Sequence, residues 1–181
     1  MTMVSRYTCG TADLAPGHVE ELRRRLRGEI LLPGDATYDK ARTVWNAAID
    51  KRPALIARCA DASDVVEAVK FARKWEILTS VRCGGHNIAG KAIAENGLMI
   101  DLTPICDVRV DPENKTAVVG GGAALGDLDR ATQTFGLATT AGVVSHIGHE
   151  HCHHTTRRSI PDESRWGNRP RRYGGTLEHP L

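Results

Sequence analysis

A short apolar run, an amphipathic helix and a second apolar run follow one another, and they restrict the fold more than any other feature. The run A-L-I-A-R (54–58) favours a strand, and L-T-S-V-R (78–82) favours a second one. Between them, residues 60–75 repeat apolar side chains at helical steps: Val65, Val69, Ala72 and Trp75. Asp61 or Ser63 can cap the first turn of this helix. The connection is long enough for a crossover, so the sequence predicts a βαβ unit in an α+β fold.

Further elements are predicted on both sides of this unit. Pro16 suits a first helical turn and Gly28 suits a stop, so we expect a helix whose apolar face is formed by Val19, Leu22 and Leu26. Downstream, the pattern predicts a strand, a hairpin and a helix, at 98–102, 108–122 and 124–136. After Gly148 no period of 2 or 3.6 is present and proline and glycine recur, so we expect no regular structure there.

The composition is that of a globular protein. The 181 residues are 41% hydrophobic and 25% charged, which suits one domain or slightly more. A net charge of +2 gives no indication of a nucleic-acid partner. No apolar stretch approaches the ~20 residues that span a bilayer, and the N-terminus lacks a signal-peptide core, so we expect a cytoplasmic protein without a membrane partner. The five cysteines are odd in number and include no C-x-x-C pair, which favours reduced thiols.

Two adjacent glycines follow the second strand of the βαβ unit, in V-R-C-G-G-H-N-I-A-G (81–90). Gly84 and Gly85 allow a tight turn and a close approach to a ligand, because no Cβ stands in the way. Consecutive N–H groups in such a turn form a concavity for an anion, Arg82 adds positive charge, and His86 projects from the rim. A plain turn with a surface histidine explains the same residues, since glycine turns are common.

A second glycine-rich stretch, V-V-G-G-G-A-A-L-G (118–126), follows a predicted strand and opens a predicted helix, as a dinucleotide-binding fingerprint does. The sixth position of G-x-G-x-x-G, counted from Gly120, is however Leu125. No acidic residue lies about 20 positions further on, where such a site holds the ribose. A simple strand–turn–helix is therefore favoured over a nicotinamide site.

A histidine cluster begins at His149, and His149, Glu150 and His153 together match H-E-x-x-H. This zinc-protease motif needs a helix that puts both histidines on one face. The surrounding sequence has no apolar stripe that would bury such a helix, so we assign no metal ligand. A metal-binding protein is kept as an alternative, with a cluster of candidate ligands: His149, His151, Cys152, His153 and His154.

The loop R-C-G-G-H-N-I-A-G resembles the flavin-attachment loop of the vanillyl-alcohol oxidase / p-cresol methylhydroxylase (PCMH) superfamily. It is most similar to that loop in the berberine-bridge-enzyme-like FAD-linked oxidases. Other stretches resemble the same family in the same order: P-A-L-I-A-R-C-A-D-A-S-D-V-V-E-A-V-K-F-A-R, N-G-L-M-I-D-L-T-P-I, V-V-G-G-G-A-A-L-G-D-L-D-R-A-T and G-L-A-T-T-A-G-V-V-S-H-I-G. The resemblance runs from about Leu31 to Gly148. It implies a partial PCMH-type FAD-binding domain, with a βαβ-like first subdomain and the start of the second.

The resemblance implies FAD as the cofactor. In the family, the loop that matches residues 82–87 cradles the FAD pyrophosphate, and the histidine that matches His86 bonds covalently to the flavin 8α-methyl. Some relatives add a cysteinyl bond from the later loop, and the matching position here is Val144, so a single histidyl link is implied. The cofactor-binding residues implied are Arg82, Cys83, Gly84, Gly85, His86, Asn87, Gly90, Gly142, Val143, Ser145, His146 and Gly148.

The reaction implied by the resemblance is hydride transfer from a C–H bond of a small-molecule substrate to flavin N5, followed by reoxidation, often by O₂. An alcohol, an amine or a sugar-like molecule is the expected substrate. An electron-withdrawing covalent link is expected to raise the flavin potential. No catalytic residue is assigned, because the family's substrate domain and its catalytic base have no counterpart in the matched sequence.

The resemblance stops at Gly148. Ile147 replaces the family's usual threonine, and the sequence from His149 onwards contains six arginines but no lysine, alanine or valine. We therefore expect an N-terminal helix and lead-in (1–35), a partial FAD-binding domain (36–148) and a disordered Arg/His-rich tail (149–181). A shifted reading frame in GC-rich DNA is one hypothesis for the tail, and the coding DNA tests it. An inactive, truncated product is the alternative to an FAD-dependent oxidoreductase.

Overall fold

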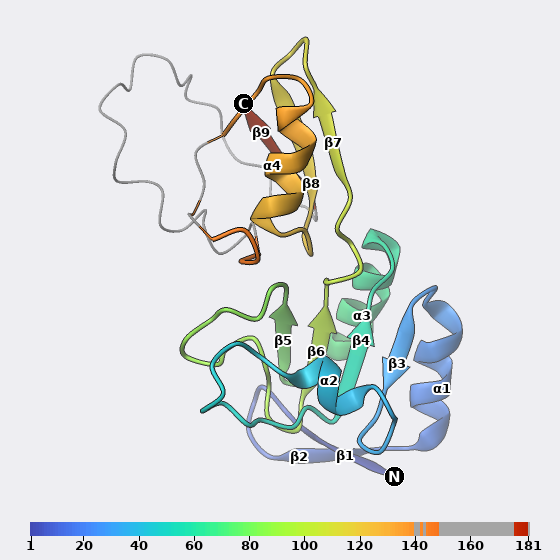
Figure 1. Cartoon of the computed structure of the whole chain (residues 1–181). Coiled ribbons are helices and arrows are strands. Elements are labelled where there is room, and N and C mark those ends of the chain that lie inside the picture. Colours follow the sequence, from blue (N-terminus) through green and yellow to red (C-terminus); the bar gives the residue numbers. More distant parts are fainter. Residues whose placement is uncertain (140–141, 143, 149–175, 181) are drawn as a thin grey trace. The chain divides into compact units, whose positions relative to one another are not determined.

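The computed structural model describes residues 1–139, 142, 144–148 and 176–180. The chain divides into two compact units, Met1–Ile105 and Cys106–Leu181, and each is described by itself. The elements of the first unit are β1 (Thr2–Ser5), β2 (Thr11–Leu14), α1 (Pro16–Arg25), β3 (Glu29–Leu31), α2 (Tyr38–Arg42), β4 (Leu55–Arg58), α3 (Ala62–Lys74), β5 (Thr79–Arg82) and β6 (Leu98–Asp101) (Figure 1). The elements of the second unit are β7 (Val108–Asp111), β8 (Thr116–Gly120), α4 (Leu125–Gln133) and β9 (Thr176–Pro180).

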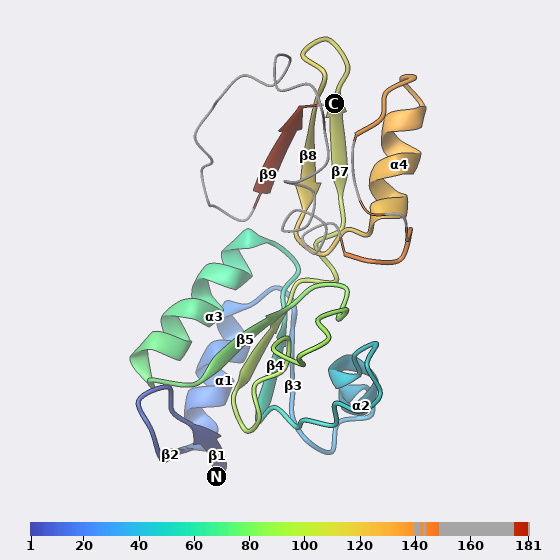
Figure 2. The same ribbon diagram turned by 90° about the vertical axis from the view of Figure 1, so that its left-hand side faces the viewer.

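A four-stranded sheet in the order β3-β4-β6-β5 forms the centre of the first unit. β4 and β5 both run parallel to β6, whereas β3 runs antiparallel to β4. The predicted βαβ unit is thus confirmed as β4–α3–β5, with β6 inserted between its two strands. Figure 2 shows α1 and α3 on one face of this sheet and α2 on the other.

Both faces of this sheet are buried, because consecutive side chains of a strand enter different cores. Leu55 of β4 and Leu98 of β6 pack into the core that includes residues of α1 and α3. Ile56 and Met99, the next residues along the same strands, pack into the core that includes Tyr38 of α2. Covering on both sides explains why β4 and β6 are unbroken apolar runs rather than alternating ones.

The face predicted for the helix at 60–75 is partly wrong. Val69 is 42% exposed, whereas Ala68, Phe71 and Ala72 are buried. The buried residue at the start of this face is Asp64, whose carboxylate accepts hydrogen bonds from the backbone N–H groups of Arg27, Gly28 and Ala60. The spacing of apolar residues did not predict this face, because one of its inward positions is occupied by the hydrogen-bonded carboxylate of Asp64. The N-terminus of α3 was predicted correctly, since Asp61 accepts from the N–H groups of Ser63 and Asp64.

The apolar face predicted for the first helix is confirmed, because Val19, Leu22 and Leu26 are all buried. The sequence did not indicate β1, β2, β3, α2 or β9, which are only three to five residues long. β9 lies in the stretch after Gly148, to which the sequence assigned no regular structure. It pairs antiparallel with β8, and this pairing uses backbone groups and needs no apolar alternation. Pro180 ends β9, a position that suits a residue without an N–H donor.

The second unit contains the predicted hairpin and helix. β7 and β8 pair antiparallel around a turn in which Asp111 accepts from the backbone N–H groups of Glu113 and Asn114. α4 packs against this hairpin through the fully buried Leu128 (Figure 1). Among the helices that the structure describes, none combines the length and the apolar character needed to cross a membrane.

Candidate functional site

The glycine loop at residues 83–90 begins where β5 ends, at the carboxyl edge of the parallel strands. The backbone carbonyl of Arg82 accepts a 2.8 Å hydrogen bond from the N–H of Leu102, just beyond β6. Pairing with β6 therefore continues to the last residue before the loop. Open sheets with parallel strands bind ligands at this edge, so the fold places the loop where a ligand is expected.

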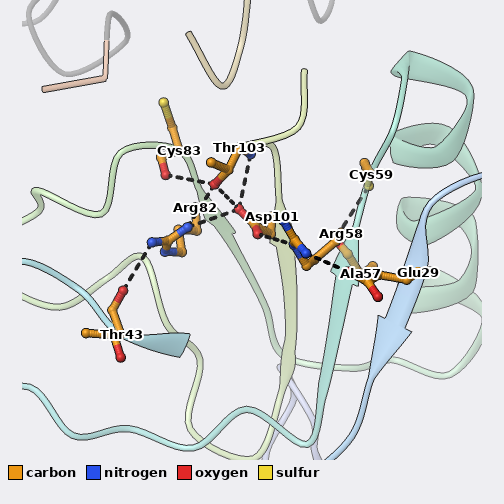
Figure 3. Close-up of polar contacts among 9 residues, drawn as sticks. All are labelled: Glu29, Thr43, Ala57, Arg58, Cys59, Arg82, Cys83, Asp101 and Thr103. Atoms are coloured by element: carbon orange, nitrogen blue, oxygen red, sulfur yellow. Dashed lines mark hydrogen bonds and ion pairs between the residues drawn. The ribbon is translucent and has the colours of Figure 1, made fainter. Parts of the chain in front are cut away.

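A buried carboxylate at the end of β6 fixes the side chains at the ends of β4 and β5. Asp101 is 1% exposed and stands in register between Arg58 and Arg82 (Figure 3). Its oxygens lie 3.3 Å from Arg58 Nε and 3.2 Å from Arg82 Nη1. Thr103 donates to the same carboxylate through its backbone N–H, and its hydroxyl accepts from Arg82 Nη1 at 2.8 Å. This network was not predicted from the sequence, because its members are far apart along the chain.

The segment between α2 and β4 lies along the glycine loop. Arg82 Nη2 donates to the carbonyl of Thr43 at 3.1 Å, as Figure 3 shows. The N–H of Trp45 donates to the carbonyl of Gly85 at 3.1 Å. Gly85 adopts a φ of +71°, and a Cβ at this position would lie 3.5 Å from Val44 and from Arg82 Nε. These distances are ordinary van der Waals contacts, so it is the left-handed backbone conformation that favours glycine here.

Several carbonyl groups of the loop accept hydrogen bonds from neighbouring segments, whereas several of its amide groups have no acceptor in the described part of the chain. The carbonyls of Cys83, Gly85 and Gly90 accept from Thr103 Oγ1, Trp45 N and Lys51 Nζ, respectively. Within the described residues, the backbone N–H groups of Gly84, Gly85 and Asn87 have no acceptor. Arg82 Nε is also buried without a hydrogen bond in this part of the chain. Open N–H donors beside a guanidinium form an arrangement that suits an anion such as a diphosphate.

The remaining loop residues close the turn. Asn87 accepts from the N–H of Gly90 through its carbonyl and from the N–H of Lys91 through its side chain. Gly90 has a φ of +66°, and a Cβ there would lie 2.7 Å from the side chain of Ile49. The imidazole of His86 stacks on the indole of Trp45, with ring centroids 5.8 Å apart. All seven residues proposed from Arg82 to Gly90 thus lie together in the first unit.

The second glycine-rich stretch is not a phosphate cradle. Its helix, α4, begins with N–H groups that already have acceptors: Leu125 donates to Ile147 at 3.0 Å and Gly126 donates to Ser145 at 2.8 Å. Ala124 also bridges Gly148 in an antiparallel arrangement. The later loop therefore covers the N-terminus of α4, which supports the exclusion of a nicotinamide site.

The later loop lies in the second unit, where four of its five predicted residues are described: Gly142, Ser145, His146 and Gly148. Val143 lies outside the described residues. The histidine cluster at 149–154 also lies outside them. Among the residues that are described, no three His, Cys, Asp or Glu side chains group in a way that could hold a metal ion.

Cys59, which follows β4, is the residue whose acidity the fold changes most clearly. Burial raises the pKa of its thiol to about 12, and nearby carboxylates including Asp64 act in the same direction. The side chain is fully buried, so Cys59 is a neutral core residue rather than a nucleophile.

Known proteins match this chain over the same region. A family model described as "FAD binding domain" matches residues 53–148, more than half of the chain. (R)-6-hydroxynicotine oxidase of Paenarthrobacter nicotinovorans is 36% identical over 123 residues, which cover 68% of this chain and 27% of that protein. Berberine bridge enzyme-like D-2 of Nicotiana tabacum is 33% identical over 108 residues, covering 53% and 19%.

A solved structure agrees with these matches. The crystal structure of 6-hydroxy-D-nicotine oxidase from Arthrobacter nicotinovorans superposes with a TM-score of 0.69 and 34% identity, covering 76% of this chain and 29% of that one. The chain spans less than a third of the length of each of these relatives. The expected α+β, PCMH-type fold is thereby confirmed. The chain belongs to the FAD-binding domain family, in the berberine-bridge-enzyme-like branch of the FAD-linked oxidoreductases.

Proposed function

We propose that this chain provides the FAD-binding part of an oxidoreductase, and that its glycine loop holds the FAD diphosphate. The observation that carries the proposal is the unequal use of the loop's backbone. The carbonyls of Cys83, Gly85 and Gly90 accept hydrogen bonds from outside the loop, whereas the N–H groups of Gly84, Gly85 and Asn87 have no acceptor within the described residues. When bound, FAD supplies an acceptor for a hydride at N5. The relatives named above are oxidases and similar enzymes, which supports the same class of reaction here.

The protein's own residues have distinct roles in this proposal. The three open N–H groups donate charge-assisted hydrogen bonds to the diphosphate. Arg82 Nη1 and Nη2 are already engaged by Asp101, Thr103 and Thr43, so this guanidinium mainly holds the loop in place and contributes its positive charge. Gly85 gives the turn beside these donors its left-handed backbone, with a φ of +71°, which side-chain-bearing residues rarely adopt.

His86 supplies the imidazole for a covalent bond to the flavin 8α-carbon. This bond would join an imidazole nitrogen to that carbon with the loss of one hydrogen from each, and dioxygen would be the oxidant that takes up the two hydrogens as hydrogen peroxide. The link is a proposal from the family resemblance, and the position of His86 between the open amides of Gly85 and Asn87 supports it.

The substrate is proposed as a small molecule with an oxidisable C–H bond, of the amine, alcohol or sugar-like class. The named relative acts on 6-hydroxynicotine, an amine. The residues that select among these classes are not assigned to this chain.

Incubation of the purified full chain with FAD and dioxygen tests the covalent bond. We expect flavin fluorescence that survives denaturation and a mass increase equal to FAD less two hydrogens. His86→Ala should abolish both signals. His18→Ala should retain them, since His18 of α1 stacks on Trp75, the residue that follows α3, and has no part in the loop. Protein that remains unmodified after long incubation would contradict the covalent link.

A pair of glycine substitutions tests the amide cradle separately, in the His86→Ala background where FAD binds reversibly. Gly85→Ala and Gly136→Ala both place a side chain at a left-handed residue, with φ of +71° and +66°. Only Gly85 adjoins the open amides, and a Cβ at Gly136 meets nothing within 4 Å. Disturbance of one charge-assisted hydrogen bond should weaken FAD binding by roughly 10- to 100-fold in Gly85→Ala alone. Equal affinities in the two variants would refute the cradle.

A further inference from the structure

We propose that Trp45 is a positioning residue for His86, which holds the imidazole in the orientation required for covalent attachment of the flavin. This inference rests on the proposed function of the loop and adds a residue that the glycine motif does not contain. Trp45 lies 41 positions before His86 in the sequence (86 − 45), and the fold brings the two rings together.

The backbone around Trp45 is fixed to the loop by three hydrogen bonds. Arg82 Nη2 donates to the carbonyl of Thr43 at 3.1 Å, and Trp45 N–H donates to the carbonyl of Gly85 at 3.1 Å. Asn46 Nδ2 donates to the carbonyl of Ile88 at 3.0 Å. Two of these bonds join loop residues before His86, and the third joins a residue after it. Residues 43–46 therefore form a strap that runs along the loop on both sides of His86.

The ring of Trp45 has little part in the hydrophobic core. It is 66% exposed, whereas Val44 beside it is only 7% exposed and belongs to the core that contains Tyr38. A tryptophan left largely in water contributes little burial to folding. What the indole does contact is the imidazole of His86, at a centroid distance of 5.8 Å and an interplanar angle of 27°.

This contact restricts the side-chain rotation of a residue that follows two glycines. A stacked pair within this range of distances is a favourable aromatic arrangement. Attachment needs one imidazole nitrogen to face the 8α-carbon, and correct orientation of reacting groups contributes strongly to such rates. The geometry therefore assigns the strap a role in attachment rather than in holding the diphosphate, whose donors are backbone amides.

The rate of covalent attachment at saturating FAD tests this role in the full chain. Loss of one aromatic pair should slow attachment by roughly 3- to 10-fold in Trp45→Ala, and Trp45→Phe should restore most of the rate. Tyr7→Ala is the matched control, because Tyr7 is an aromatic residue of the same unit with 61% exposure. The hydrogen bond from Trp45 to Gly85 uses the backbone, so these substitutions remove the ring alone.

FAD affinity is measured in parallel, in the double variant Trp45→Ala/His86→Ala and in the single variant His86→Ala. The two affinities should agree within about twofold, which is well below the effect expected for a lost hydrogen bond to the diphosphate. Equal attachment rates in the wild type and Trp45→Ala would overturn the positioning role. So would a loss of FAD affinity well beyond twofold, which would assign the ring to FAD binding, or a failure of Trp45→Phe to restore the attachment rate. A wild-type chain that binds FAD but never attaches it overturns the covalent bond proposed above and this role with it. If the wild type attaches FAD and Trp45→Ala attaches it at the same rate, only the positioning role of Trp45 is overturned.

Discussion

The two loops that resemble flavin-contacting segments are held in different ways. The loop at 83–90 is fixed through side chains and carbonyls, with Arg82 bound to the buried Asp101, and its amides at Gly84 and Gly85 stay open within the described residues. The loop at 144–148 is fixed through its backbone, whose carbonyls take up the first N–H groups of α4. Glycine-rich sequence is thus no guide to phosphate binding by itself. What matters is whether the fold leaves the N–H groups without acceptors.

The largest expected effect comes from removing the charge beneath the first loop. Asp101→Asn leaves Arg58 and Arg82 without their shared carboxylate, and Arg82 is only 15% exposed. Loss of one member of a buried ion pair should lower the free energy of unfolding by about 3–5 kcal/mol. Chemical denaturation of the first unit, followed by tryptophan fluorescence, measures this change.

Asp107→Asn is the control for this substitution. Its pair with Arg109 is 3.4 Å long, but the two side chains are 59% and 81% exposed. An exposed pair contributes at most ~1 kcal/mol, so this variant should unfold almost as the wild type does. A similar loss of stability in both variants would show that the loop does not depend on the buried network.

A smaller effect is expected where the second loop covers α4. Gly126→Ala would place a Cβ 3.1 Å from the Cβ of Ser145 and 3.2 Å from its carbonyl oxygen. The crowding should destabilise the second unit by about 1–3 kcal/mol, detected as faster hydrogen exchange of the Leu125 and Gly126-position amides. Gly17→Ala is the matched control, because Gly17 is also the second residue of its helix and has open space around it. Gly17→Ala should be neutral or slightly stabilising. If Gly126→Ala left the hydrogen-exchange protection of α4 unchanged, the loop at 144–148 would not hold the start of this helix.

The smallest expected effect concerns thiols in the two units. At pH 8.5, Cys106 in the second unit should react with an alkylating reagent, because it is exposed, whereas the buried Cys59 should not. The raised pKa of Cys59 means that the folded state keeps this proton when the unfolded state loses it, above about pH 8.5. The contribution of Cys59 to stability should therefore fall as the pH rises from there towards 12. Peptide mapping after a short alkylation pulse measures the labelling of Cys106 and Cys59. Rapid labelling of Cys59 in the native protein would contradict its burial.

Local patterns predicted the elements that carry a helical period, an apolar run or clear turn residues. The βαβ unit, the first helix, the hairpin and α4 all follow from apolar spacing and turn residues, and the glycines of the first loop identified its place. The inward face of α3 was misplaced at Val69, because Asp64 is buried for its hydrogen bonds rather than for its hydrophobicity. β1, β3 and β9 were missed, since a strand of three to five residues shows no period, and none of them is an unbroken apolar run of the kind that indicated β4 and β6.

The sequence by itself determined the order of the elements from β4 to α4, the family and the loop that carries His86, because helix periods, glycine turns and motifs are properties of neighbouring residues. Only the tertiary structure decided that Asp101 stands between Arg58 and Arg82, and that Trp45 lies on His86. These contacts join residues 19 to 43 positions apart along the chain. Their partners depend on strand order and register, which the burial of the whole sheet selects and no local pattern encodes.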